Sequence, residues 1–179
     1  FPSEFGGAKS EKYCMEKEAN GNPRYGRDTE NKYDIAALLT SDDTFGIGQA
    51  LRIISGEYGT VTGRPRRVGS LDLVQLAQSV KTNGVSELIL NKCDLLQAYS
   101  GTRLEGMPFV TGYKLDNKMI DYIPASAAVY ARVQPVTEYM EGFKQNIDEC
   151  RSYDTLPKQL KRFLKEIEKR TGCRITGIG

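Results

Sequence analysis

The segment Ser70–Asp94, SLDLVQLAQSVKTNGVSELILNKCD, gives the strongest indication of the fold class. Apolar residues recur in its first half at helical spacing, at Leu73, Leu76, Ala77 and Val80. This spacing predicts a helix over Leu71–Asn83, with Ser70 as its N-cap and Gly84 at its end. The run Ser86–Leu90 predicts a short buried strand, and polar residues follow it at once. A helix followed by such a strand is typical of an α/β fold, where ligands bind beyond the C-terminal ends of strands.

Further elements are expected before this segment. The stretches Asp34–Thr40 and Thr44–Ser55 predict helix, and Gly56 can end the second. Its apolar face is expected to hold Ile47, Leu51 and Ile54. Residues 1–32 are polar and turn-rich around Ala19–Pro23, so no regular element is predicted there. The first residue is Phe1 rather than Met, and we expect sequence to precede it.

The part of the chain after Asp94 continues the α/β pattern. The alternation over Phe109–Ile123 predicts a β-hairpin that turns at Asp116 and Asn117. The stretch Val133–Phe143, interrupted by Pro135 and Gly142, predicts a short helix or turn. Leu156–Thr171 predicts an amphipathic helix that Asp154 or Thr155 caps, Pro157 opens and Gly172 ends. Arg174–Gly179 predicts a strand that runs into a glycine loop.

The composition excludes several classes of protein. The chain has 179 residues, of which 39% are hydrophobic and 27% charged, which is typical of one soluble domain. A net charge of +2 is too small for a general nucleic-acid binder. Apolar runs are shorter than the ~20 residues that a membrane span requires. Four cysteines without a CxxC pair favour a reducing, cytoplasmic compartment.

The absence of histidine from the sequence limits the chemistry of the chain. It excludes a Ser-His-Asp or Cys-His nucleophile, a histidine general base and a zinc site that uses histidine. We therefore assign no catalytic residue and no metal ligand to this chain. If the protein is an enzyme, a carboxylate or sequence outside this chain transfers the proton.

A glycine- and arginine-rich loop, Tyr58–Gly69 (YGTVTGRPRRVG), is the clearest candidate for a binding site. Two threonine hydroxyls, glycine backbone and three arginines lie together in it. Arginine binds carboxylates and phosphates with two parallel hydrogen bonds, and Pro65 stiffens the loop. The loop therefore suits a dicarboxylate or a phosphate. A solvated basic turn is the structural alternative.

A second candidate site follows the predicted strand, at Asn91-Lys92-Cys93-Asp94. A carboxylate there can accept two N–H groups of guanine that adenine lacks, and the lysine stem can lie along the base. The GxxxxGK[ST] loop of a Ras-like GTPase is missing from the sequence, so a free-standing small GTPase is not expected. Gly177 and Gly179 form a GxG pattern, which by itself is weak evidence for a binding site.

These segments together resemble the adenylosuccinate synthetase family. Phe1-Pro2-Ser3-Glu4 is similar to its FPTE segment, and Glu57–Gly69 with Leu71-Asp72 resembles its aspartate-binding loop and following helix. Asn91–Asp94 resembles its K-x-D guanine contact, and the later segments keep the family's order. The resemblance implies the C-terminal portion of a P-loop-like adenylosuccinate synthetase fold, a mixed sheet with flanking helices and a β-hairpin. Residues 1–56 would be a variable, insertion-containing segment, 57–69 the aspartate loop and 70–179 the guanine-nucleotide portion.

The resemblance also implies roles for particular residues. The site for aspartate and the purine nucleotide would comprise Thr60, Val61, Thr62, Gly63, Arg64 and Arg66. The site for GTP would comprise Arg66, Lys92, Cys93, Asp94, Gly177 and Gly179. The implied activity is the GTP-dependent ligation of L-aspartate to IMP in purine biosynthesis. The P-loop, catalytic Asp and His, and Mg²⁺ ligands would lie on N-terminal sequence outside this chain.

Two alternatives stay open at this point. The long segment before Gly56 and the compact remainder look like the short archaeal and phage enzymes, and the phage type adds aspartate to dGMP with ATP or GTP as donor. A nucleotide-binding module without catalysis is the other alternative. A cytoplasmic homodimer that binds neither nucleic acid nor membranes is expected for the ligase.

Overall fold

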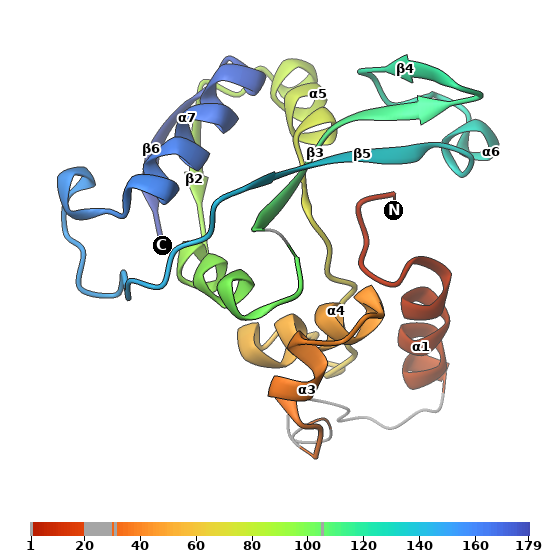
Figure 1. Cartoon of the computed structure of the whole chain (residues 1–179). Coiled ribbons are helices and arrows are strands. Elements are labelled where there is room, and N and C mark those ends of the chain that lie inside the picture. Colours follow the sequence, from red (N-terminus) through yellow and green to blue (C-terminus); the bar gives the residue numbers. More distant parts are fainter. Residues whose placement is uncertain (1, 20–29, 31, 105) are drawn as a thin grey trace. The chain divides into compact units, whose positions relative to one another are not determined.

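A computed structural model of the chain describes residues 2–19, 30, 32–104 and 106–179 (Figure 1). The chain forms two compact units. The first comprises residues 3–70 with 101–103, and the second comprises residues 71–100 with 104–179. The main boundary falls between Ser70 and Leu71, directly after the loop rich in arginine and glycine.

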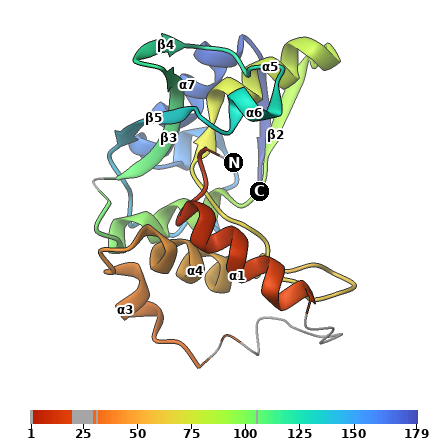
Figure 2. The ribbon, with the colours of Figure 1, turned by 90° about the vertical axis from the view of Figure 1, so that its right-hand side faces the viewer.

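The first unit is helical. Its helices are α1 (Gly7–Ala19), α3 (Ile35–Leu39) and α4 (Thr44–Ser55). The α4 helix begins at Asp43, whose carboxylate accepts the Phe45 N–H, and it ends at Gly56 in the left-handed conformation (φ 65°). The helix α1 packs against α4, and the two lie side by side in Figure 2.

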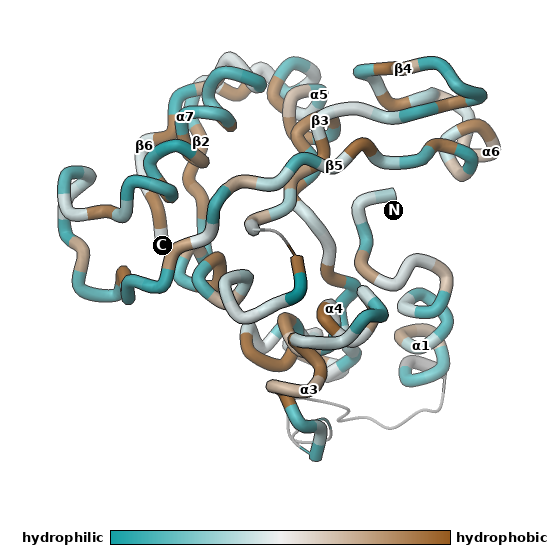
Figure 3. The backbone as a smooth tube through the Cα atoms, viewed as in Figure 1, coloured by the Kyte–Doolittle hydropathy of each residue, from teal (hydrophilic) through white to brown (hydrophobic). Residues whose placement is uncertain are grey.

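The packing around α4 differs in part from the predicted apolar face. Ile47 and Leu51 are buried as expected, whereas Ile54 is half-buried and Ile53 takes the interior place. Figure 3 shows the apolar residues along this helix. A Cβ on Gly48 would lie 2.8 Å from the Cβ of Phe5, so glycine allows this close contact.

The helix α1 was not predicted from the sequence. Its residues are mostly polar and make no continuous apolar stripe, so the hydrophobic period that indicates a helix is absent. Its contacts are instead polar and aromatic: the Tyr13 ring lies edge-on to Phe45 with centroids 5.5 Å apart. The turn expected after Ala19 lies outside the described residues.

The second unit has the α/β architecture that the sequence predicts, with a mixed sheet. The strand β3 (Met107–Leu115) pairs in parallel with β1 (Leu71–Asp72) and antiparallel with β4 (Lys118–Ile120) and β5 (Gln134–Met140). The β3–β4 turn at Asp116 and Asn117 has positive φ at both residues, which confirms the predicted hairpin. A separate parallel pair joins β2 (Glu87–Leu90) to β6 (Arg174–Ile178). The strand β2 is not buried as expected, since Ile89 is 68% exposed, and Gly177 lies within β6 rather than in a loop.

Helices pack onto these strands. They are α5 (Leu73–Asn83), α6 (Ala127–Tyr130) and α7 (Lys158–Thr171), with 3₁₀ segments η1 (Cys93–Gly101) and η2 (Tyr153–Thr155). The apolar face predicted for α7 is buried, and its Phe163 ring lies 6.0 Å from that of Phe109 on β3. A second cluster of buried residues comprises Val74, Val110, Tyr113 and Val133.

Three further predictions of local structure were wrong. The stretch expected as a helix or turn over Val133–Phe143 contains strand β5, where β-branched and aromatic residues pair with β3 and the strand accommodates Pro135. The N-cap of α5 is Asp72, not Ser70, because its carboxylate accepts the N–H groups of Val74 and Gln75.

The third correction concerns the start of α7. Asp154 and Thr155 lie in η2, and Pro157 takes the capping position without a side-chain hydrogen bond. The predicted end of the helix at Gly172 is confirmed, with φ of 67°. Among the helices of the described residues, none has the length and apolarity needed to cross a bilayer.

Candidate functional site

The arginine-rich loop is a small hairpin in the first unit. Tyr58 and Pro65 form an antiparallel bridge across it. The Gly59 N–H donates to the Arg64 carbonyl (2.8 Å), and the Arg66 N–H donates to the Glu57 carbonyl (2.9 Å). The chain therefore reverses between Gly59 and Arg64, and the predicted binding residues 60–63 form the hairpin tip.

The tip presents its groups to solvent. Thr60, Val61 and Thr62 are exposed, and Val61 keeps 90% of its surface accessible. Gly63 has φ of 65°, and its N–H donates to the Gly59 carbonyl (2.8 Å), which closes the turn. An exposed tip of hydroxyl and backbone N–H groups is a surface that a small anion can approach.

The three arginines have different environments. Arg66 forms an ion pair with Glu57 (2.9 Å), while Arg67 bridges Glu4 (3.4 Å) and Glu11 (2.8 Å). Arg64 is exposed beside the tip. Arg67 therefore ties the hairpin to preceding segments, whereas Arg64 and Arg66 remain on the surface next to the predicted binding residues.

A hollow of about 370 Å³ lies beside this arginine cluster. Its walls come from α1 and from the second arm of the hairpin: Glu11, Cys14, Met15, Arg64, Pro65, Arg66 and Arg67. Three guanidinium groups line this hollow, and carboxylates of Glu57, Glu4 and Glu11 pair with two of them. The hollow therefore offers guanidinium donors to an anionic group, although nearby carboxylates balance much of their charge.

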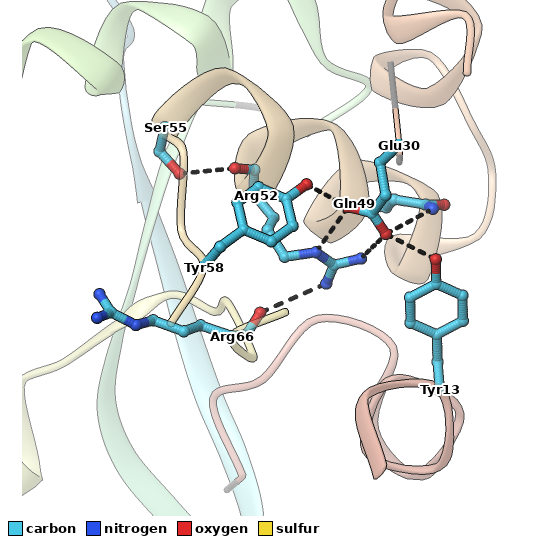
Figure 4. A network of polar contacts seen from close by, with 7 residues as sticks. All are labelled: Tyr13, Glu30, Gln49, Arg52, Ser55, Tyr58 and Arg66. Atoms are coloured by element: carbon cyan, nitrogen blue, oxygen red, sulfur yellow. Dashed lines mark hydrogen bonds and ion pairs between the residues drawn. The ribbon is translucent and has the colours of Figure 1, made fainter. Parts of the chain in front are cut away.

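A buried polar network lies under the hairpin base (Figure 4). The Arg52 side chain is 1% exposed and that of Glu30 is 0% exposed, and they pair at 3.0 Å. Glu30 also accepts hydrogen bonds from the hydroxyls of Tyr13 and Tyr58. Arg52 Nη1 donates to the Arg66 carbonyl oxygen (3.4 Å). The network thus reaches both arms of the hairpin.

Sequence reasoning missed this network. Arg52 lies between Leu51 and Ile53 in α4, and all three are buried. The sequence did contain one signal for this network, namely a charged residue within an apolar helix face. A buried guanidinium needs a carboxylate partner that is buried with it. The sequence contains many carboxylate residues, and no pattern in it identifies Glu30 as the partner of Arg52.

The second candidate site lies in the second unit, beyond the parallel strands β2 and β6. Leu90 pairs with Ile178, and the Gly179 N–H donates to the Leu90 carbonyl (2.8 Å). The Cys93 N–H in turn donates to the Gly179 carbonyl (2.8 Å). The structure therefore brings the predicted segments 91–94 and 177–179 together at one edge.

The residues of this edge differ in exposure. Lys92 is exposed and has φ of 60°, Asp94 is half-buried in the first turn of η1, and Cys93 is buried. Burial, with a contribution from the Asp94 charge, raises the pKa of the Cys93 thiol to about 11. The thiol is held against the Leu90 carbonyl (3.6 Å), so Cys93 contributes to this edge through its backbone.

A cavity of about 350 Å³ opens beside Gly177. Residues of three segments line it: Cys150–Tyr153, then Leu156, Leu164 and Glu168, and the strand residues Ile175–Ile178. Among the described residues, no three metal-ligating side chains gather at one point.

Comparisons with known proteins agree with this arrangement. The family description "Adenylosuccinate synthetase" matches residues 31–179. Adenylosuccinate synthetase of Caldanaerobacter subterraneus is 41% identical over 74% of this chain and 30% of its own length. Adenylosuccinate synthetase 2 of Cupriavidus pinatubonensis is 36% identical over 100% of the chain and 36% of its own length.

A solved structure supports the same relationship. Fully ligated adenylosuccinate synthetase from Plasmodium falciparum matches with a TM-score of 0.68 and 30% identity, over 79% of this chain and 33% of that one. The chain spans about a third of the length of the relatives it matches. On its sequence and on its fold, this chain belongs to the adenylosuccinate synthetase family.

Proposed function

We propose that the chain is the C-terminal recognition part of a ligase that joins L-aspartate to the 6-position of IMP with consumption of GTP. The hairpin tip at residues 60–63, flanked by Arg64 and Arg66, carries this proposal. Its hydroxyls, backbone N–H groups and guanidinium forks match the two carboxylates of aspartate. Arg64 would contact aspartate and the nucleotide ribose, and Arg66 would reach aspartate and the GTP side.

The guanine base would lie at the edge formed by segments 91–94 and 177–179. The half-buried Asp94 carboxylate would accept the N1–H and exocyclic N–H of guanine, and the exposed Lys92 stem would cover one face of the base. The hydrogen bonds between Cys93, Gly179 and Leu90 support this role, because they fix the two segments that would hold the base.

The family reaction has two steps, and this chain would assist both by binding. GTP phosphorylates the purine 6-oxygen, and the aspartate amine then displaces the phosphate. The arginines of the hairpin would hold aspartate with its amine toward the purine and would stabilise the negative charge of the transferring phosphoryl group. Mg²⁺, when bound, neutralises phosphate charge, and its ligands and the acid–base groups would lie outside this chain.

The remaining expectations belong to the whole protein. We propose a homodimer that acts in the cytoplasm on small molecules, with no nucleic-acid or membrane partner. The cysteines of the described residues are free, which fits a reducing compartment. IMP is proposed over dGMP because the compared relatives bear the name adenylosuccinate synthetase. The likeness to short archaeal or phage enzymes stays a prediction.

A coupled assay on the full-length protein tests the proposal. IMP and dGMP are offered separately with aspartate, each with GTP or ATP, and product formation is followed by absorbance. Activity with IMP and GTP alone is the expected result. Activity only with dGMP would identify the phage type, and nucleotide binding without turnover in every combination would leave a binding module.

A further inference from the structure

The hairpin base is anchored by groups that belong to two other segments. The Tyr58 hydroxyl donates to Glu30, and Arg52 of α4 donates to Glu30 through Nε (3.1 Å) and Nη2 (3.0 Å). The remaining Nη1 donates to the Arg66 carbonyl (3.4 Å). One carboxylate and one guanidinium therefore contact the first arm of the hairpin at Tyr58 and the second arm at Arg66 (Figure 4).

The burial of Glu30 and Arg52 restricts the positions that their side chains can take. Both side chains are almost fully excluded from solvent. Removing one partner would leave an uncompensated buried charge, so each charged side chain holds the other in place. Gln49 (3.4 Å) and Tyr13 (2.6 Å) supply further donors to Glu30 Oε1. A hairpin attached to such a network loses less conformational entropy when it binds a ligand.

The carboxylate comes from a segment distant in sequence. Glu30 lies 22 residues before Arg52 and 28 residues before Tyr58. The folded chain, rather than its local sequence, therefore supplies the support under the hairpin.

We propose that Glu30 and Arg52 are positioning residues that hold the Tyr58–Arg66 hairpin in its aspartate-binding shape. This inference rests on the proposed function of the hairpin. Neither side chain belongs to the proposed ligand surface, since both are buried beneath the hairpin base. Their loss should therefore weaken aspartate binding more than it slows the chemical step.

A matched pair of variants separates positioning from general stability. Tyr58→Phe and Tyr13→Phe each remove one hydroxyl from the same Glu30 carboxylate, but only Tyr58 belongs to the hairpin. In the full-length protein we expect Tyr58→Phe to raise the aspartate KM about fivefold, with kcat changed less than about twofold. Tyr13→Phe should leave the aspartate KM within about twofold of wild type. Equal effects of both variants would overturn the proposal.

A second comparison addresses Arg52 directly. Arg52→Lys keeps the charge next to Glu30 but lacks the fork that also reaches the Arg66 carbonyl, so the aspartate KM should rise about tenfold. If the single variant fails to fold, the double variant Glu30→Gln with Arg52→Met replaces it, because removing both buried charges together leaves neither one unpaired. The double variant should show the same rise in KM. An unchanged KM in both folded proteins would refute positioning.

Hydrogen exchange gives a readout that is independent of ligase activity. The amides of Gly59, Gly63 and Arg66 are hydrogen-bonded within the hairpin. They should exchange faster in Tyr58→Phe and Arg52→Lys than in Tyr13→Phe, without any substrate present. Unchanged exchange would overturn the proposal. A wild-type protein that lacks ligase activity would instead overturn the proposed function, and faster exchange in Tyr58→Phe would still support the anchoring of the hairpin.

Discussion

The Cys93 N–H and the Gly179 carbonyl share a hydrogen bond of 2.8 Å that joins the segment after β2 to the segment after β6. The two residues are distant in sequence, and the parallel pairing of their strands brings them together. This contact holds the segment that carries Asp94 against the end of β6, where we propose that the guanine base binds.

Asp94→Asn should weaken GTP binding while leaving aspartate affinity largely unchanged. The amide would present a donor toward the N–H groups of guanine and remove the carboxylate charge. We expect the GTP KM to rise at least about tenfold, measured by steady-state kinetics of the full-length protein. The exposed Asp121→Asn is the matched control. An equal loss of affinity for GTP and aspartate would contradict a base-reading role.

Arg64→Ala should raise the KM values for aspartate and for the purine nucleotide together. Arg64 is exposed beside the hairpin tip and is proposed to touch both substrates. The expected rise is about tenfold or more for each, since a charged hydrogen bond is lost. Arg103→Ala, which removes an exposed arginine that pairs with Asp42, serves as the control. Unchanged kinetics for both substrates would refute the assignment.

Cys93 should resist thiol reagents in the native protein. Its side chain is 4% exposed and the pKa of its thiol is raised to about 11, so at about pH 8 only about one thousandth is thiolate. The half-buried Cys150 should react first. Labelling with a disulfide reagent followed by peptide mass spectrometry checks this order, and early modification of Cys93 would contradict the buried environment.

Ile167→Ala should destabilise the second unit by about 2–5 kcal/mol. Ile167 is fully buried on the apolar face of α7, so the truncation leaves a cavity. The exposed Lys165→Ala on the same helix should change the free energy of unfolding by less than about 0.5 kcal/mol. Urea unfolding of the two variants and the wild type measures the difference, and equal midpoints would show that α7 is not packed as described.

The Glu30 network should contribute to stability above acid pH. Burial acts to raise the Glu30 pKa, but hydrogen bonds from Arg52, Tyr13 and Tyr58 outweigh it and hold the pKa below the ordinary 4.5. The unfolded chain then binds the proton at higher pH than the folded one. The contribution is therefore complete above about pH 4.5 and is lost as pH falls toward the folded pKa.

The other groups near this carboxylate do not reverse that direction. Gln49 is neutral, and burial raises the pKa of the Cys14 thiol and that of the Tyr58 hydroxyl, so both stay protonated in acid. Urea unfolding between about pH 6 and about pH 3 should show a smaller loss of stability for Glu30→Gln with Arg52→Met than for wild type. Identical acid profiles would refute this linkage.

Local sequence patterns predicted several of the helices and strands. The periodicity of Leu73–Val80 located α5, which buries one face, and the apolar run before Asn91 located β2. The burial expected for β2 was wrong, because its residues alternate between exposed and half-buried. The glycines at positions 84 and 172 ended their helices as expected, both with positive φ. Strand β5 was missed because Pro135 and Gly142 favour a break, whereas pairing with β3 over seven residues outweighs that local preference.

The candidate site was predictable only in its surface residues. Arginine, threonine and glycine in one loop indicated an anion site, and their spacing was visible in the sequence. The partner of Arg52 was not visible, because Glu30 comes from a distant segment that no periodicity connects to α4. Contacts between segments far apart in sequence require the folded chain, and these contacts hold the hairpin.

The parallel pairing of β2 with β6 also determines when the base-binding edge can form. Strand β6 is synthesised after helix α7, and two parallel strands of distant sequence pay a large loop-closure entropy before they meet. During translation, segment 91–94 emerges long before its partner. The nascent chain therefore passes through a stage in which the hairpin segment 58–66 has been synthesised but the edge between segments 91–94 and 177–179 cannot yet form.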